Sequence, residues 1–253
     1  MPHSLGGISI GNVESYLEQI IREKGVAHLT LFDPEKLTPK HASRLALEAK
    51  RAGTAAAMVG GSTATSTYQL DTIVRAIKSS RLPVILFPND IAGLSQYADA
   101  VFFMSLLNST NPYYISGAQA LGAPLVKRYN LEPIPLGYLI VGEDAGAAGF
   151  IGSAKPIPYD KPELAAIYAL AAQYMGMRFV YLEAGSGAKR SIPTEMVKAV
   201  KKACRIHVVV GGGIRTVARA KALADAGASV IVTGTLSEKS SIRRLHELIR
   251  AIR

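Results

Sequence analysis

Short apolar runs alternate with amphipathic stretches along the chain, and this alternation predicts strands that are each followed by a helix. The apolar runs are nearly continuous and rich in β-branched side chains, as in parallel strands that are buried on both faces. The predicted strands cover residues 26–32, 55–59, 83–87, 100–104, 134–141, 178–183, 207–210 and 229–232. Eight such strands in 253 residues indicate a closed α/β barrel of the (β/α)8 or TIM-barrel class. No linker or low-complexity stretch divides the sequence, so we expect one domain over residues 1–253.

Proline and glycine mark the ends of predicted helices. Thr38 and Pro39 are typical of a helix start, and Gly53 is typical of a helix end. A leading helix over residues 13–24 is expected to cover the floor of the barrel. A last helix is expected over residues 240–252.

Two connections between predicted strands have unusual lengths. Only about a dozen residues, 88–99, separate the third and fourth strands, which is the minimum for a helical crossover. We therefore expect the third helix to be missing or reduced to a turn, with a cleft beside these two strands. The connection over residues 141–159 is long and rich in Gly and Ala, and loops of this kind are often functional. Its part over 146–153 is a candidate lid.

Composition and charge narrow the classes of function. Hydrophobic residues make up 49% of the chain and charged residues 19%, as in a folded soluble protein. Cys204 is the single cysteine, no apolar run is long enough to span a membrane, and the N-terminus lacks signal-peptide features, so we expect a cytoplasmic protein. The formal net charge of +10 favours nucleic acid, an anionic membrane surface or anionic substrates as partners. Aromatic residues are not interleaved with the basic ones, so no nucleic-acid partner is expected.

Glycines follow the last two predicted strands, at the end of the barrel where active sites lie in this class. The seventh strand ends in three glycines, 211–213, ahead of a helix start at Arg215, and the eighth ends in Thr-Gly-Thr at 233–235. Glycines allow backbone N–H groups to approach a phosphate, which the helix dipole also favours. We therefore expect a phosphate site, with plain tight turns as the alternative.

Carboxylates occupy two further strand ends. Glu183 ends the sixth strand, and a carboxylate beside a phosphate site suits a polyol phosphate whose hydroxyl it binds or deprotonates. The alternative for Glu183 is a helix cap or an ion pair. Asp33 follows the first strand and Ser62 the second, and such oxygen donors suit Mg2+ together with substrate phosphates. Asp33 could instead cap a turn, and Lys36 could pair with Asp33 or with a phosphate.

Other reactive residue types form no recognisable motif. His28 and His207 lie within predicted strands and are expected to pack, and Cys204 has no neighbouring base to activate it. The sequence has no Cys/His zinc pattern, no Walker-type lysine loop and no Gly-x-Gly-x-x-Gly after a strand. Nicotinamide and nucleotide chemistry are therefore not expected.

Five segments in chain order together resemble the geranylgeranylglyceryl phosphate synthases. They are Phe-Asp-Pro-Glu-Lys at 32–36, Val-Gly-Gly-Ser at 59–62, Tyr-Leu-Glu-Ala-Gly-Ser-Gly at 181–187, Gly-Gly-Gly-Ile-Arg at 211–215 and Thr-Gly-Thr at 233–235. The resemblance spans nearly the whole chain, and the segment 181–187 is the most specific part. It implies a barrel whose third helix is replaced by an extended segment. It also implies a Mg2+-dependent prenyltransferase of archaeal ether-lipid synthesis that joins geranylgeranyl diphosphate, a prenyl diphosphate, to sn-glycerol 1-phosphate.

The resemblance also assigns expected roles to individual residues. Asp33 and Ser62 would contact Mg2+, and Glu183 would act as the base or orient the acceptor hydroxyl. Glycerol phosphate would be held by Tyr181, Leu182, Glu183, Ala184, Gly185, Ser186, Gly187, Gly212, Gly213, Gly234 and Thr235. Related sequences often have Asn in place of Thr235. A homo-oligomer and a peripheral membrane contact are further expectations.

Two other activities remain open at this point. A bacterial relative transfers a longer, heptaprenyl chain to the same acceptor. A sugar-phosphate isomerase or aldolase on a phosphate-binding barrel would instead need a reactive lysine or an acid/base pair. The prenyl tail needs an apolar groove, for which residues 101–104 with Tyr113 and Tyr114 are the candidates.

Overall fold

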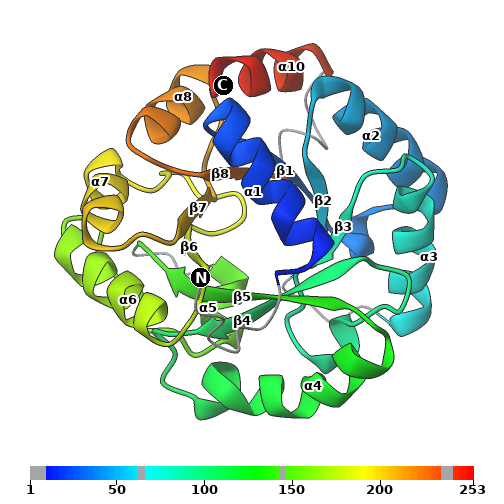
Figure 1. The fold of residues 1–253 in the computed structure, drawn as a ribbon, viewed down its shortest axis with the longest axis horizontal. Coiled ribbons are helices and arrows are strands. Elements are labelled where there is room, and N and C mark those ends of the chain that lie inside the picture. Colours follow the sequence, from blue (N-terminus) through cyan, green and yellow to red (C-terminus); the bar gives the residue numbers. More distant parts are fainter. Residues whose placement is uncertain (1–9, 62–65, 143–145, 235–241) are drawn as a thin grey trace, which may run out of the picture.

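In the computed structural model, parallel strands close into a barrel surrounded by helices (Figure 1). The residues described are 10–61, 66–142, 146–234 and 242–253. The strands are β1 (Ala27–Phe32), β2 (Ala56–Val59), β3 (Val84–Leu86), β4 (Ala100–Leu106), β5 (Glu132–Ile140), β6 (Phe179–Glu183), β7 (His207–Gly211) and β8 (Val230–Thr233). Each strand pairs with the next, and β8 pairs with β1, so the predicted closed barrel is confirmed.

The helices follow the strands in the order that the apolar pattern predicts. They are α1 (Asn12–Lys24), α2 (Pro39–Ala52), α3 (Thr67–Lys78), α4 (Ala118–Arg128), α5 (Gly146–Ile151), α6 (Pro162–Tyr174), α7 (Thr194–Ala203), α8 (Val217–Asp225) and α10 (Ile242–Ala251). Thr38 caps α2 by accepting from the backbone N–H of His41, and Gly53 ends it in the left-handed region at φ +98°. No helix within the described residues is both long and apolar enough to cross a membrane.

Alternate strand residues form two buried layers. Side chains such as Leu29, Met58 and Phe102 fill the interior of the barrel, and Phe32 and Val59 belong to the layer under the helices. This division explains why the strands read as continuous apolar runs and not as alternating ones. Because side chains fill the interior of the barrel, a ligand can bind only at one of its ends.

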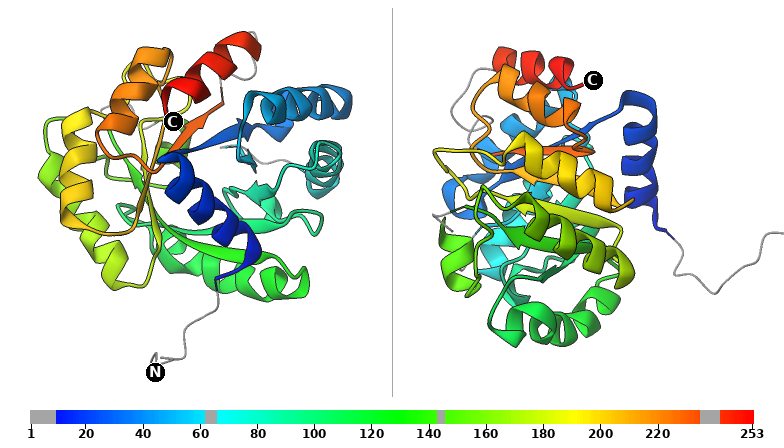
Figure 2. Two further views of the ribbon diagram at one scale, coloured as in Figure 1. Left: turned by 45° about the horizontal axis from the view of Figure 1, so that its top comes forward. Right: turned by 90° about the vertical axis from the view of Figure 1, so that its left-hand side faces the viewer.

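Helix α1 closes one end of the barrel, as the sequence predicted (Figures 1 and 2). Its Leu17 is fully buried in the interior layer. The carboxylate of Glu132, on β5, accepts from the backbone N–H groups of Val13 and Glu14 at 2.8 Å each. The buried Glu14 also pairs with Arg178. The site must therefore lie at the opposite end, where the strands terminate.

The connection between β3 and β4 contains only the one-turn helix η2 (Ile91–Gly93). The prediction that the third helix is reduced to a turn is therefore confirmed. The next element, η3 (Tyr113–Gly117), is a π-helical turn that leads into α4. Within the long connection after β5, residues 146–151 form the short helix α5 and residues 143–145 lie outside the described part.

Candidate active site

A cavity of about 530 Å³ opens at the carboxyl ends of the strands. One part of it is bordered by the glycine-rich turns after β6, β7 and β8. The other part extends between η2 and α4, beside the strands that lack a covering helix. The residues that line this second part include Pro88, Ile91, Leu94, Val101, Phe103, Tyr114, Ala118, Gln119, Gly122 and Val126. A polar end and an apolar groove therefore belong to one continuous space.

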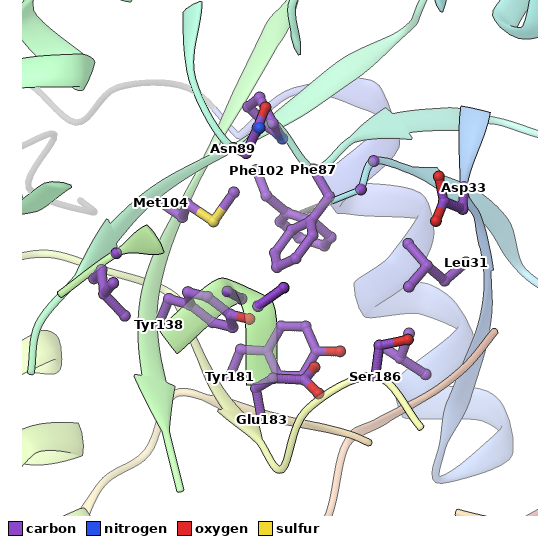
Figure 3. Close-up of a pocket in the computed structure, with 18 of the residues that line it drawn as sticks. Leu31, Asp33, Phe87, Asn89, Phe102, Met104, Tyr138, Tyr181, Glu183 and Ser186 are labelled. Carbon is purple, nitrogen blue, oxygen red and sulfur yellow. The ribbon is translucent and has the colours of Figure 1, made fainter. Parts of the chain in front are cut away.

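Glu183 is the buried carboxylate at the polar end of this cavity (Figure 3). Its side chain is 7% exposed, and its Oε1 accepts from the backbone N–H of Gly185 at 2.7 Å. Burial raises the pKa of Glu183, while hydrogen bonds from the Tyr181 hydroxyl and the Gly185 N–H partly oppose the rise. No ion pair among the described residues includes Glu183. A carboxylate in this setting is suited to accepting a proton.

The glycine turn after β7 is shaped around Glu183. Gly212 has φ +79°, and a Cβ there would lie 2.6 Å from Glu183 Oε1 and 2.7 Å from the Gly185 nitrogen. At Gly213, with φ +66°, a Cβ would lie 2.6 Å from the carbonyl oxygen of Arg190. The turns after β6 and β7 are therefore in close contact, and glycine is required where they meet.

Two arginines in the segment after β7 donate hydrogen bonds to backbone carbonyls of the segment after β6. Arg215 Nη2 donates to the carbonyl oxygens of Gly187 and Ala188 at 2.8 and 3.1 Å. Arg219, one helical turn later, donates from Nη2 to the carbonyl oxygen of Ile192 at 2.5 Å. Arg215 also lines the cavity, so it brings a positive charge to the polar end. Sequence reasoning did not assign these arginines a role, although Arg215 directly follows the predicted phosphate turn.

Asp33 borders the cavity from the end of β1 (Figure 3). Its Oδ1 accepts from the Glu35 backbone N–H at 3.1 Å, and its Oδ2 lies 2.6 Å from Lys36 Nζ. The capping role and the pairing with Lys36, both considered as alternatives, are thus present. The side chain remains 16% exposed, so a carboxylate edge is still open to the cavity.

The donor set around Asp33 fits a hard cation with few protein ligands. Gly61 lies against Asp33, where a Cβ would be 3.0 Å from Oδ1, so the loop after β2 leaves room beside the carboxylate. The described residues contain no cluster of three or more His, Cys, Asp or Glu side chains that could hold a metal. A Mg2+ ion bound here would therefore take its other ligands from water and substrate phosphates, as this ion commonly does. Ser62, the second expected ligand, lies outside the described residues.

Most of the predicted site residues meet in the cavity. Those that line it are Asp33, Tyr181, Glu183, Gly185, Ser186, Gly187, Gly212, Gly213 and Gly234. Leu182 and Ala184 do not line it, because their side chains are buried in the layer under the helices. Thr235 lies outside the described residues.

The predicted tail groove lies partly along the cavity. Val101, Phe102, Phe103, Met104 and Tyr114 border the cavity, whereas Tyr113 is absent from its lining and instead contacts Tyr114 edge to face. Ala147, Ala148 and Ile151 of the candidate lid also line it.

Sequence reasoning missed the aromatic side chains Phe87 and Tyr138, which face the centre of the cavity (Figure 3). The available signal was that Phe87 ends the third predicted strand.

His28 takes no part in the cavity. It is buried, and its ring nitrogens lie 3.0 Å from the Thr54 hydroxyl and 2.9 Å from the Thr233 hydroxyl. Burial, reinforced by the charge of Arg253, lowers the pKa of His28 to about 3, so the ring is neutral near pH 7.

Comparison with known sequences gives a consistent family. The model of the PcrB family matches residues 18–252. The chain is 53% identical to the geranylgeranylglyceryl phosphate synthase of Thermococcus kodakarensis, covering 97% of this chain and 99% of the relative. It is also 53% identical to the protein of the same name from Thermofilum pendens, over 96% of each chain.

Solved structures agree with the sequence comparison. The (S)-3-O-geranylgeranylglyceryl phosphate synthase of Thermoplasma acidophilum, solved in complex with sn-glycerol-1-phosphate, superposes with a TM-score of 0.89 at 44% identity, covering 93% of this chain and 97% of that chain. A thiamine phosphate pyrophosphorylase from Pyrococcus furiosus, at 16% identity and a TM-score of 0.57, shares the fold alone. With a family match over nearly its whole length and relatives above 50% identity, the chain belongs to the PcrB family, together with the geranylgeranylglyceryl phosphate synthases.

Proposed function

We propose that residues 1–253 form a single Mg2+-dependent prenyltransferase domain that joins geranylgeranyl diphosphate to sn-glycerol 1-phosphate. The products are 3-O-geranylgeranylglyceryl phosphate and diphosphate, the first ether-linked intermediate of archaeal lipid synthesis and its leaving group. The observation that carries the proposal is one cavity that joins the buried carboxylate of Glu183, which has no ion-pair partner among the described residues, to an apolar groove. The names of the relatives and the glycerol phosphate in the related Thermoplasma structure support it.

The acceptor binds at the polar end of the cavity. The phosphate of glycerol phosphate lies against the turns that contain Gly212, Gly213 and Gly234, where backbone N–H groups can approach it. Glu183 then receives the hydroxyl of the acceptor and takes its proton as the new C–O bond forms. Because Glu183 is held by Gly185 and Tyr181, its carboxylate is oriented before the substrate arrives.

The donor binds with its diphosphate near Asp33 and its tail in the groove. Asp33 and Ser62 are the proposed Mg2+ ligands, and the ion supplies stabilisation of the negative charge on the departing diphosphate. The groove between η2 and α4 holds the prenyl chain against side chains such as Leu94, Val101 and Phe103. Binding both substrates in one space aligns the hydroxyl with the first prenyl carbon.

The direct test is an assay of purified protein with Mg2+, sn-glycerol 1-phosphate and labelled prenyl diphosphates from C10 to C35. Product with the C20 donor and none with sn-glycerol 3-phosphate is the expected result. Preference for the C35 donor would reassign the chain to heptaprenylglyceryl phosphate synthesis. No transfer from any donor would overturn the prenyltransferase proposal and return attention to sugar-phosphate isomerases and aldolases.

Gly212→Ala is expected to raise the KM for sn-glycerol 1-phosphate by about tenfold or more, because the new Cβ crowds Glu183 and Gly185. The left-handed φ adds a stability cost of about 1–2 kcal/mol. Gly176→Ala is the matched control, since Gly176 has φ +83° but no atom within 4 Å of its Cβ position. Steady-state kinetics and thermal unfolding of both variants separate crowding from strain. An equal KM in the two variants would contradict the proposed acceptor site.

Arg215→Ala is expected to raise the KM for sn-glycerol 1-phosphate by roughly tenfold, with a smaller change in kcat. The substitution removes a cation that lines the cavity and frees the carbonyls of Gly187 and Ala188. Arg219→Ala is the control, because Arg219 fastens the same loop without lining the cavity. It should lower thermal stability and leave the KM nearly unchanged. The same KM increase in both variants would show that Arg215 affects acceptor binding only by holding the loop in place, and not through its charge.

Assembly and membrane contact stay predictions. On α6 the side chains of Ile167 and Tyr174 are 64% and 79% exposed, an apolar surface of the kind that subunit contacts use. Light scattering of the purified protein tests the expected homo-oligomer. Flotation with anionic lipid vesicles tests the peripheral membrane contact.

A further inference from the structure

Three aromatic rings converge on the cavity next to Glu183 (Figure 3). Phe87 directly follows β3, Tyr138 lies on β5 and Tyr181 on β6. The Phe87 ring centroid is 5.3 Å from that of Tyr138, nearly perpendicular to it at 88°, and 5.5 Å from that of Tyr181 at 40°. The two tyrosine centroids are 5.4 Å apart. Each ring thus supports the other two, and the group has a fixed geometry.

The three rings differ in how far they are exposed to the cavity. Tyr181 is 1% exposed and Tyr138 is 6% exposed, whereas Phe87 is only partly buried. Burial, followed by the nearby charge of Glu183, raises the pKa of both tyrosines well above the ordinary value. Both side chains are therefore neutral phenols near pH 7. Phe87 presents the accessible ring, and the tyrosines hold it in place.

Prenyl transfer creates a charge that such a group can stabilise. When the bond between C1 and the diphosphate oxygen breaks, its electron pair leaves with the diphosphate and positive charge spreads over C1 and C3 of the allylic chain. An oxygen lone pair of the acceptor hydroxyl then forms the new bond to C1, and the hydroxyl proton passes to Glu183. The face of an aromatic ring attracts a cation that lies within about 6 Å of its centroid.

The position of Phe87 matches this requirement. In the view of Figure 3 it lies between Met104 and Asp33, above Tyr181 and Glu183. In the binding mode proposed above, the diphosphate lies near Asp33 and the tail lies in the groove, so C1 of the donor falls in the part of the cavity that Phe87 lines. The cation–π pairs among the described residues, Arg75 over Tyr97 and Arg190 over Tyr159, do not include Phe87.

We propose that Phe87 is a further catalytic residue, whose ring face stabilises the allylic cation, with Tyr138 and Tyr181 as positioning residues behind it. This inference rests on the prenyl transfer proposed above. It assigns chemistry to a side chain that otherwise would be only part of the wall of the tail groove. A wall needs shape and apolarity, whereas cation stabilisation needs electron density on the ring face, and the two requirements can be tested separately.

The test replaces Phe87 by phenylalanines with one, two or three ring fluorines, introduced by nonsense suppression. Fluorine withdraws electron density from the ring face while keeping its shape and apolar surface. The single-turnover rate with excess enzyme should fall stepwise with each fluorine, by on the order of tenfold for the trifluorinated ring. The KM for sn-glycerol 1-phosphate should not change, because the acceptor end is untouched. A rate independent of fluorination would overturn the proposal.

Controls separate this outcome from loss of fold and from failure of the proposed function. Phe179→Leu removes a fully buried barrel ring that does not line the cavity, and it should change thermal stability more than the single-turnover rate. A rate loss in Phe179→Leu as large as in Phe87→Leu would assign the effect to packing and overturn the proposal. The wild-type protein must first transfer a prenyl group; if it does not, the proposed function itself fails. If the wild type is active and the single-turnover rate does not change with the number of fluorines, only the proposed role of Phe87 is overturned.

Discussion

Glu183→Gln is expected to lower kcat by about a thousandfold while making the folded protein more stable. The amide keeps the size of the side chain and can still accept from the Gly185 N–H. It cannot take the proton of the acceptor hydroxyl. The kcat should fall in wild type as the pH drops through the pKa of Glu183, which burial places above the ordinary glutamate range. Glu183→Gln should lack this acidic limb.

The stability part of the prediction follows from linkage. The pKa of Glu183 is raised in the folded state, so the folded protein binds this proton more tightly than the unfolded chain. The folded state therefore loses stability as the pH rises through the interval between the two pKa values. Gln removes the buried charge, and we expect a gain of about 1 kcal/mol at neutral pH.

Thermal and urea unfolding at pH 5 and pH 8 measure this gain. Glu195→Gln, at an exposed residue paired with Lys198, is the control and should change neither activity nor stability strongly. A destabilised Glu183→Gln protein would show that the carboxylate is structural, and near wild-type turnover would exclude it as the base.

Asp33→Ala is expected to abolish Mg2+-dependent turnover, a loss of about three orders of magnitude or more. The carboxylate is the only described acidic group of the cavity that we assign to the ion, so its loss leaves the diphosphate charge uncompensated. Because Asp33 also caps a turn through the Glu35 N–H, alanine alone could act through folding.

Asp33→Asn separates loss of the charge from loss of the cap, since asparagine caps a turn as well as aspartate does but carries no charge. Both variants should need far more Mg2+ for half-maximal rate, and only Asp33→Ala should lose stability. Lys36→Met is the control in which the Asp33 carboxylate is kept and only its ion pair is removed. This variant should keep the Mg2+ dependence of the wild type. Substantial turnover in Asp33→Asn at low Mg2+ would contradict the metal assignment.

The barrel was predictable because its strands are long enough to leave a continuous apolar signature. The differences are at the ends: β4 continues two residues past the predicted 104, and β5 begins at Glu132, whose carboxylate caps α1. Such boundaries depend on partners distant in sequence, and local pattern cannot reveal them. The reduced third helix was predictable from length alone, since residues 88–99 are only about the minimum for a helical crossover.

The polar end of the site was predictable for a similar reason. Glycines and carboxylates at strand ends must gather at one end of a barrel, whichever strands carry them. The group of Phe87, Tyr138 and Tyr181 was not predictable from the sequence. Tyr138 lies within β5, and only the register of the barrel shows that its side chain points inward. Leu182 and Ala184 have their side chains in the layer under the helices, so the contact with the acceptor that we expect of them would come from their backbone groups.

The absence of a full helix after β3 also affects how the sheet is held together. Strands β3 and β4 share only the pairs Ile85–Ala100 and Leu86–Val101, while β4 and β5 share a register of seven pairs. The β7–β8 seam is as short, but the connection between its two strands contains the full helix α8. Widening the barrel is therefore least costly along β3–β4, the side that faces the groove. A long hydrocarbon chain could enter or leave there sideways, while the strands that carry the head-group turns keep their register.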